Sequence, residues 1–388
     1  MATLVQPPPQ PRPLPRPRLR AGAGPGPRTA GVRHLGPHYY AAVMGTAIVG
    51  TAGTGLPLRV PGLRTACTAL WALALVALAV LLGARAAHWA RHRDQARAHL
   101  LDPAVAPFYG CLAMALTSVG GGALLVGRDW VGAGAAVALG AVLWAAGTAA
   151  GLAVAVGVPY LMVVRHRVEG APPLWLLPVV APMVSAATGP LLAPHLSEGQ
   201  ARGTLLAACH ALFGLSALAA LLVLPLVFGR LVTAGPPPVA ATPALLLVLG
   251  PLGQSVTAVG AFADAAPGVP YARGVAVAYG LPVTGFALLW LALVGALVVR
   301  ARRRGMRFAM TWWAFTFPVG TCVTGLEGLA RHTGLVVLDG AAVALYALLV
   351  AGWLAAASGT VRGLVSGTLL AGPGPAPGAP GRGTARTR

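Results

Sequence analysis

Charged side chains are scarce in this sequence of 388 residues. Only 9% of the residues are charged, whereas 57% are hydrophobic, and the mean hydropathy is +0.75. A soluble domain carries about a quarter charged residues, so this composition excludes a soluble globular fold. Lysine is absent, and only 8 acidic residues oppose 28 basic residues, all of them arginine. The formal net charge of +20 must therefore be located along the chain before it is taken as a nucleic-acid-binding surface.

Cysteine is also scarce. The 4 cysteines lie in four different apolar segments, and no two of them have CxxC spacing; they are Cys67, Cys111, Cys209 and Cys322. This pattern argues against a disulfide framework and against a cysteine-based metal site. We expect no cofactor.

Long apolar runs, by contrast, fill most of the chain. A helix needs about 20 apolar residues to cross roughly 30 Å of hydrocarbon, where its backbone groups must pair internally. The sequence therefore predicts an all-α integral membrane protein with ten transmembrane helices. Short connections favour five antiparallel helical hairpins. The predicted spans lie near residues 38–57, 63–87, 105–127, 130–162, 174–193, 203–232, 240–263, 272–299, 307–330 and 335–361.

Proline, glycine and arginine dominate both ends of the chain. Residues 1–36 and 362–388 are predicted to be disordered tails that flank a transmembrane domain at 37–361. Positively charged loops tend to stay in the cytoplasm. With the N-terminus inside, 22 of the 28 arginines lie inside and 6 outside. The arginine excess is thus a topology signal for a multi-pass plasma-membrane protein with both termini cytoplasmic, and we expect no nucleic-acid partner.

Odd-numbered and even-numbered spans differ in composition. Odd spans carry proline, glycine and hydroxyl residues near their centres, as in LPVVAPMVSAATGP from Leu177, whereas even spans such as ALWALALVALAVLLGA from Ala69 are mostly aliphatic. The alternation indicates five repeats of a two-helix unit. The simplest arrangement places the odd spans around a central pore and the even spans against lipid.

Small and hydroxyl residues recur every three or four positions on the odd spans, so each set shares one helix face. The same stripes allow membrane helices to pack closely, with serine and threonine bonding to backbone groups. Their repetition on alternating helices favours a narrow, weakly polar passage. The predicted pore-lining residues are Thr46, Gly50, Gly110, Thr117, Ser118, Pro182, Ser185, Thr188, Gly253, Thr257, Pro318, Gly320, Thr321 and Thr324.

Three motifs carry a family resemblance: MGTAIVG on the first span, WLLPVVAPMVSAATG on the fifth and MTWWAFTFPVG on the ninth. They resemble the tellurite-resistance and dicarboxylate transporter family, which includes plant slow anion channels, fungal malate permeases and sulfite efflux pumps. The resemblance covers roughly residues 37–361. It implies five hairpins around a pore, assembly as a homotrimer, and a ninth-helix phenylalanine that plugs the pore. That phenylalanine falls here on Phe317.

The position of Phe317 along its span suits a gate. Phe317 lies ten residues into the ninth predicted span, and at 1.5 Å per residue this is about 15 Å, close to the midplane. Phe315 is the competing candidate because it points to a different helix face. A passage lined by hydroxyls and glycines, with almost no acidic side chains, suits anions that bind weakly enough to leave.

Glu327 is the only acid well inside a predicted span. An intramembrane acid is a functional candidate by default, so Glu327 is a possible proton site. The alternative is an interfacial ion pair with Arg331, one helical turn later.

Together these features predict a channel or transporter for small anions, of which C4-dicarboxylate, sulfite, a tellurite-related oxyanion, chloride and nitrate are the candidates. A proton-coupled C4-dicarboxylate carrier is the alternative. A polytopic membrane enzyme is disfavoured, because it would need acidic or histidine side chains that converge within the bilayer.

Overall fold

The computed structural model describes residues 33–58, 60–165 and 170–369, and within these ranges the chain forms helices and no β-strand. The predicted tails lie mostly outside the described residues. Leu35 is buried, and the last helix continues past residue 361 to Val365.

Within the described ranges, eight helical segments are long and apolar enough to cross a membrane. Their ends lie within about five residues of the predicted spans. The multi-pass membrane architecture is therefore supported by length and composition. The segments are α3 (Leu63–Arg91), η2–α5–η3–α6 (Ala106–Val131), α7 (Ala133–Val164), η4–α8–η5 (Pro173–His195), α9 (Gln200–Ala234), η6–α10 (Val239–Ala265), α11 (Ala272–Arg303) and α13 (Val336–Val365).

The first and ninth predicted spans form shorter helices. Helix α2 (Tyr40–Ala52) has 13 residues and follows the 3₁₀ turn η1 (Pro37–Tyr39), and α12 (Phe317–Thr333) has 17 residues. The total of ten transmembrane helices therefore stays a prediction. The structure also adds a short helix that was not predicted, α4 (Arg93–Leu101), between the second and third spans.

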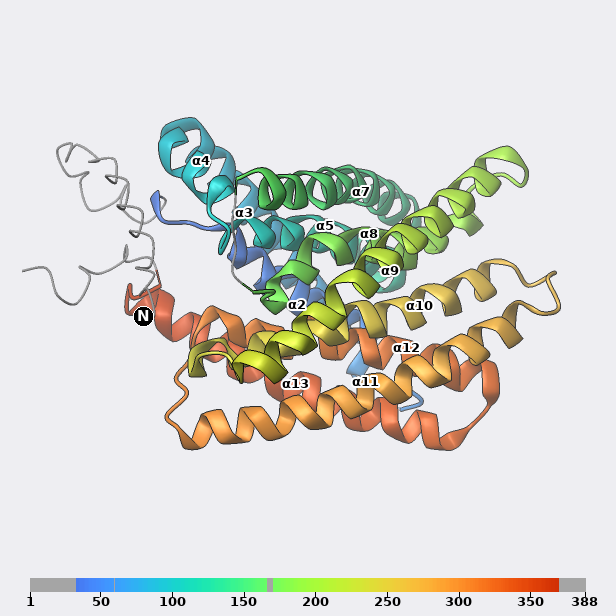
Figure 1. Ribbon diagram of the computed structural model, residues 1–388. Helices are drawn as coiled ribbons and strands as arrows, with labels where there is room; N and C mark the ends of the chain where they lie inside the picture. Colours follow the sequence, from blue (N-terminus) through green and yellow to red (C-terminus); the bar gives the residue numbers. More distant parts are fainter. Residues whose placement is uncertain (1–32, 59, 166–169, 370–388) are drawn as a thin grey trace, which may run out of the picture.

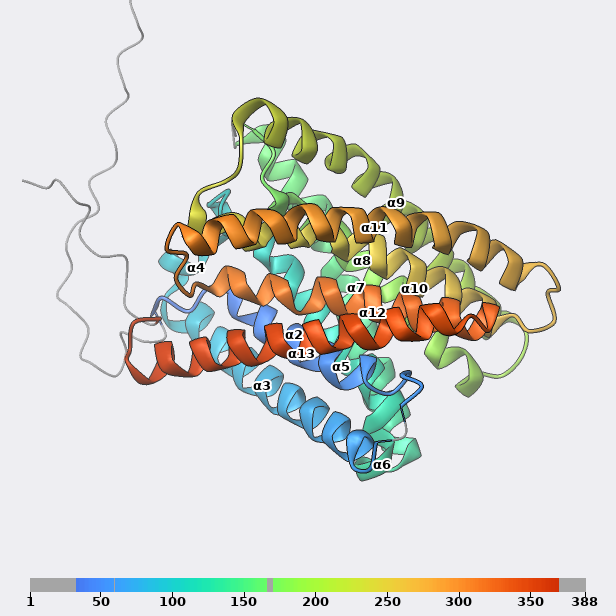
Figure 2. The ribbon, with the colours of Figure 1, turned by 90° about the horizontal axis from the view of Figure 1, so that it is seen from below.

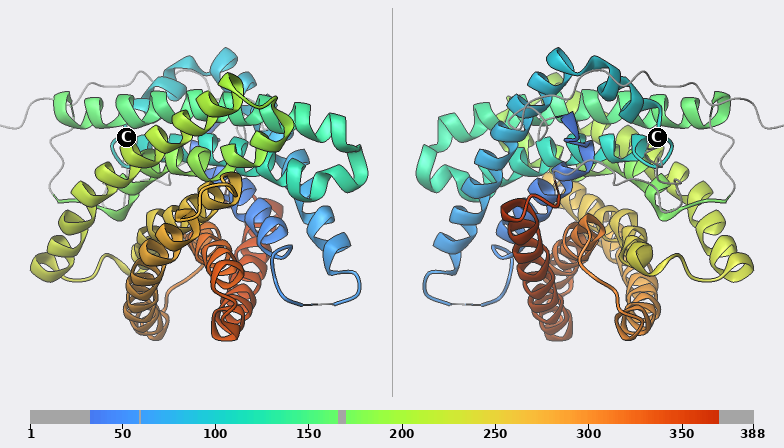
Figure 3. Two further views of the ribbon diagram at one scale, coloured as in Figure 1. Left: turned by 90° about the vertical axis from the view of Figure 1, so that its right-hand side faces the viewer. Right: turned by 90° about the vertical axis from the view of Figure 1, so that its left-hand side faces the viewer.

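The predicted alternation of inner and outer helices is visible in their burial. In the most apolar stretch of each odd segment measured, between 72% and 89% of the residues are buried, whereas the even helices α3, α7, α9, α11 and α13 bury between 17% and 28%. The even helices leave leucine and valine side chains exposed, which suits contact with lipid. Figures 1 and 2 show α11 and α13 running roughly parallel while α9 is inclined to them, and Figure 3 views the molecule from its two ends.

The inner helices form a closed ring. Each contacts two inner neighbours, in the order α2, α5, α8, α10, α12 and back to α2. Each also contacts the outer helix that follows it in sequence, so the hairpins α2–α3, α5–α7, α8–α9, α10–α11 and α12–α13 are all formed. The start of the first hairpin meets the end of the last one, where the Tyr39 hydroxyl donates a hydrogen bond of 2.7 Å to the Leu369 carbonyl.

Every inner helix begins with a 3₁₀ stretch, which is tighter than an α-helix and has poorer hydrogen bonds. Proline stands at the first or second position of η1, η2 and η4. In the last inner segment the helix breaks at Thr316, whose φ of −102° and ψ of −83° lie outside the helical region, and Pro318 follows. The five 3₁₀ stretches are η1, η2 (Ala106–Phe108), η4 (Pro173–Trp175), η6 (Val239–Val248) and η7 (Met310–Phe315).

Indole groups of the outer helices tie the two layers together. Each donates its Nε1 proton to an oxygen of an inner segment at 2.9 to 3.0 Å. Such a bond satisfies the hydrogen-bonding requirement of the indole N–H, which lies in an apolar environment. The pairs are Trp71 to the Val119 carbonyl, Trp144 to the Ser185 carbonyl, Trp290 to the Leu245 carbonyl and Trp353 to the Thr46 hydroxyl.

We expect Trp71→Phe to lower the free energy of unfolding by about 1–2 kcal/mol, because it removes one buried hydrogen bond and part of a buried side chain. Trp71 is only 1% exposed. Unfolding by denaturant in detergent micelles measures the loss. Trp130→Phe is the matched control, because Trp130 is 56% exposed. An equal loss of unfolding free energy in the two variants would contradict the stabilising role of the hydrogen bond between the outer and inner helices.

Candidate functional site

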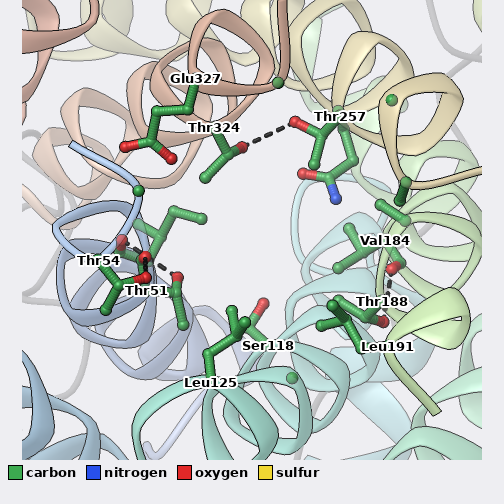
Figure 4. A pocket seen from close by; sticks show the side chains of 18 of the residues that line it. Thr51, Thr54, Ser118, Leu125, Val184, Thr188, Leu191, Thr257, Thr324 and Glu327 are labelled. Atoms are coloured by element: carbon green, nitrogen blue, oxygen red, sulfur yellow. Dashed lines mark hydrogen bonds between the residues drawn. The ribbon is translucent and has the colours of Figure 1, made fainter. Parts of the chain in front are cut away.

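A cavity of about 490 Å³ lies within the ring of inner helices, and all five contribute to its wall (Figure 4). Most of its polar side chains are short hydroxyls. Two carboxyl groups and one guanidinium accompany them. The polar lining residues are Thr51, Thr54, Ser118, Thr188, Gln254, Thr257, Asp264, Thr324, Glu327 and Arg331.

The structure brings together a subset of the predicted site residues at this wall. Six of them line it, one or more from each of α5, α8, α10 and α12. The segments that carry them are far apart in sequence and meet only through closure of the ring. The six are Ser118, Thr188, Thr257, Phe317, Thr324 and Glu327.

Four predicted hydroxyl residues are not part of this wall. Thr46, Thr117 and Thr321 donate to carbonyls of their own helices, at 2.8, 3.1 and 2.7 Å. Ser185 is fully buried. The three threonines bond to backbone groups, which is the alternative that the small-residue stripes left open, whereas the buried Ser185 hydroxyl has no hydrogen-bond partner among the described residues.

The four predicted glycines also do not line the cavity, and they mark close helix contacts instead. A methyl group at Gly110 would overlap the Leu177 carbonyl of α8, and one at Gly253 would overlap the backbone of α12. Gly50 faces α3 in the same way, and Gly320 faces α2. Of the two predicted prolines, Pro182 is buried within α8, and Pro318 lines a smaller cavity described below.

Sequence reasoning missed several wall residues. Gln254 is 4% exposed and lies one helical turn before Thr257, so the helical spacing of α10 could have identified it. Asp264 and Arg331 lie at the ends of α10 and α12, and only the contact between those two helices brings them together. No signal in the sequence pairs these ends.

The threonine hydroxyls on the wall donate hydrogen bonds to backbone carbonyls or, in the pair Thr257 and Thr324, to each other. Thr54 donates to Thr51 at 2.7 Å, and Thr188 donates to Val184 at 2.8 Å. Thr257 and Thr324 lie 2.7 Å apart, and each also has a backbone carbonyl within 3.1 Å (Figure 4). The oxygen atoms of these hydroxyls therefore present lone pairs to the cavity rather than protons.

The predicted ion pair between Glu327 and Arg331 is not formed. Arg331 instead donates to Asp264 at 3.1 Å, and His332 lies 2.8 Å from the other oxygen of Asp264. Asp264 reaches them because α10 and α12 pack against each other. Glu327 is 6% exposed and forms no ion pair with any described residue. It packs against Gly55, where a methyl group would overlap its carboxylate.

Phe317 lies in the wall of this cavity and also in the wall of a much smaller one. Its ring is 2% exposed and lines both spaces. The smaller space holds about 10 Å³, which is the volume of roughly one water-sized probe, and its wall is apolar. Phe315, the competing aromatic, packs its backbone against Gly352 of α13 and stands 6.0 Å from the Trp312 ring. The smaller cavity is lined by Met44, Met114, Leu176, Leu177, Val180, Leu247, Gly250, Phe317 and Pro318.

The chain is similar to several proteins that are named as transporters or efflux pumps. The chain is 28% identical over 323 residues to a sulfite efflux pump, SSU1, of Arthroderma otae, an alignment that covers 78% of this chain and 84% of that relative. It is also 28% identical to SSU1 of Trichophyton rubrum, over 76% of this chain and 82% of the relative. An uncharacterized transporter of Methanocaldococcus jannaschii, MJ0576, is 24% identical over 88% of this chain and 96% of its own length.

A family match covers most of the described chain. Residues 34–361 match the SLAC1 family, whose description is voltage-dependent anion channel. The match includes all five hairpins and the whole ring of inner helices. The chain therefore belongs to the SLAC1 family of voltage-dependent anion channels.

Proposed function

We propose that small anions cross the membrane along the axis of the inner ring and that Phe317 is the gate. The observation that carries this proposal is the position of Phe317 between a cavity of about 490 Å³ and an apolar space of about 10 Å³. A path along the axis must pass its ring. The aromatic ring closes such a path sterically and by dewetting, and a rotamer change or a small helix shift opens it.

The apolar half of the path explains why closure is tight. Met44, Met114 and Leu177 line the small space beyond Phe317, and none offers a hydrogen bond to an anion. An ion there would lose its hydration without replacement, which is costly. Movement of Phe317 must therefore admit water to this section, or expose backbone groups of the neighbouring helix breaks to it, before an anion crosses.

The orientation follows from charge. The arginine-rich end of α11, with Arg300, Arg302, Arg303 and Arg304, belongs to the cytoplasmic side under the positive-inside rule. The large cavity opens near the opposite ends of α10 and α12, and so faces the exterior in this arrangement. We propose a plasma-membrane protein with both termini cytoplasmic, assembled as a homotrimer in the manner the family resemblance implies.

The names of two relatives favour sulfite as the first substrate to test, in the direction of efflux. C4-dicarboxylate, a tellurite-related oxyanion, chloride and nitrate are the other candidates. A wall of hydroxyls, one amide, two carboxyl groups and one guanidinium does not by itself identify an anion, so the assay must compare the candidate anions in one preparation.

A second candidate function is proton-coupled exchange of C4-dicarboxylate. The observation that favours it is Glu327, a carboxylate on the cavity wall that no described cation pairs with. Such a group can take up and release a proton as a substrate passes.

We expect Phe317→Ala to raise anion conductance about tenfold or more, which corresponds to a barrier lower by about 1.4 kcal/mol. Purified protein in planar bilayers, with sulfite, chloride and nitrate compared, measures this. The matched control is Phe315→Ala, since Phe315 faces α13 and not the cavity. The proposal fails if neither the wild type nor the Phe317 variant conducts any anion.

For the carrier alternative, Glu327→Gln is expected to abolish malate uptake driven by a pH gradient while the protein still folds. Uptake by proteoliposomes is measured, and elution as a single species in detergent checks the fold. Glu198→Gln is the control, because the Glu198 side chain is 94% exposed and lies outside the cavity. Unaltered uptake in the Glu327 variant would rule the carrier mechanism out.

A further inference from the structure

An exposed ion pair lies at the mouth of the large cavity. Arg331 of α12 donates a hydrogen bond of 3.1 Å to Asp264 of α10, and both residues line the cavity. Their side chains are 55% and 47% exposed, so ions in solution reach them. Of the described residues that line this cavity, Arg331 is the only cation. An anion that enters here therefore meets one guanidinium, and that guanidinium already holds a carboxylate.

The pair is well separated from Phe317. Phe317 begins α12, and at 1.5 Å per residue Arg331 lies about 21 Å further along the same helix. At the end of α10, Arg202 of α9 donates at 3.0 Å to the carbonyl of Ala265, the residue after Asp264. This bond fixes the end of α10 to the outer layer of helices. Asp264 is therefore held in place by more than its contact with Arg331.

The two carboxylate oxygens of Asp264 have different partners. Oδ2 accepts the hydrogen bond of Arg331, whereas Oδ1 lies 2.8 Å from Nε2 of His332, whose side chain is 4% exposed. A carboxylate can only accept, so Nε2 of His332 must carry the proton of this bond. If the guanidinium leaves, Asp264 still has the hydrogen bond of a buried imidazole. The carboxylate thus stays between α10 and α12 while Arg331 binds another anion.

The contact between Arg331 and Asp264 is of a kind that an anion from solution can replace. Ion pairs between half-exposed side chains contribute little net free energy, because water solvates both partners when they separate. The planar guanidinium offers its N–H groups equally to a carboxylate and to an inorganic oxyanion. Asp264 therefore occupies a position on Arg331 that a passing anion can take.

We propose that Arg331 is an anion-binding residue at the mouth of the cavity and that Asp264 competes with the anion for it. An arriving anion replaces Asp264 on the guanidinium, and His332 retains the displaced carboxylate. The competition weakens the hold on the anion, so an ion that binds at the mouth also leaves it, as conduction requires. This inference rests on the proposed anion path and adds a second point of control, at the opposite end of α12 from Phe317.

Nitrate binding to the purified protein tests the competition without any need for transport. The rise of the unfolding temperature with nitrate concentration, at low ionic strength in detergent, gives an apparent Kd. Asp264→Asn keeps the shape of the side chain but removes its charge. We expect it to lower the apparent Kd for nitrate about threefold to fivefold, the factor that corresponds to one exposed ion pair.

The matched control is Asp339→Asn. Asp339 lies in the first turn of α13, which follows α12 directly and so begins at the same end of the bundle, but it does not line the cavity. The variant removes the same charge and is expected to leave the apparent Kd unchanged. In Phe317→Ala channels in planar bilayers, Asp264→Asn is expected to lower the nitrate concentration for half-maximal conductance by the same factor, and Asp339→Asn is not.

A double-mutant cycle separates competition for Arg331 from a general effect of charge. Arg331→Gln removes the guanidinium and is expected to weaken nitrate binding. In the Arg331→Gln background, Asp264→Asn is expected to change the apparent Kd no more than Asp339→Asn does. If Asp264→Asn strengthens binding equally with and without Arg331, the carboxylate acts through charge alone and the proposed competition is overturned.

The other outcomes keep this inference apart from the proposed function. An apparent Kd that is the same in the wild type and in Asp264→Asn overturns the competition, as does the lack of any nitrate effect on either protein. If Phe317→Ala channels carry no current while the nitrate cycle behaves as expected, the proposed function fails and the binding site remains. Elution as a single species in detergent checks each fold. Should Asp264→Asn not fold, Arg331→Gln decides, and an unchanged apparent Kd overturns the inference.

Discussion

A backbone group that leaves its helix inside a bilayer finds no water, and this constraint organises the whole molecule. The inner segments are broken by 3₁₀ stretches and prolines. Their oxygens find donors in the outer layer, as when Trp290 donates to Leu245 inside η6 and Trp71 donates to Val119. A core of interrupted helices can exist here because long, unbroken helices surround it on the lipid side.

The sequence allowed the helices to be predicted well, because apolar length is a strong signal: the eighth span was expected at 272–299 and α11 covers Ala272–Arg303. The sequence does not reveal which small residues line the cavity and which pack against a neighbouring helix. Gly253 packs against α12 while Thr257, one turn later, is on the cavity wall, and both satisfy the same spacing. The ion-pair partner of Arg331 could not be predicted either, because Asp264 lies 67 residues away in the sequence and in another hairpin.

The charges of the molecule are separated along its axis. The cavity wall holds the carboxyl groups of Asp264 and Glu327 and a single guanidinium, so it is not a cationic funnel. The arginine cluster that includes Arg300 and Arg303 lies at the other end of the bundle. Exposed charges act over about 8–10 Å at physiological ionic strength, so that cluster influences ions only at its own entrance. On the anion path proposed here, discrimination inside the cavity comes from hydrogen bonding and shape.

The ring of inner helices closes on itself, with α12 against α2 and the Tyr39 hydroxyl bound to Leu369. In the described part of the chain, no hairpin is therefore first or last in space. The width of the axial cavity depends on the number of helices in the ring and on how closely neighbouring helices pack. Each inner helix contacts two others, so the opening movement proposed here would change contacts on both sides of the segment that moves.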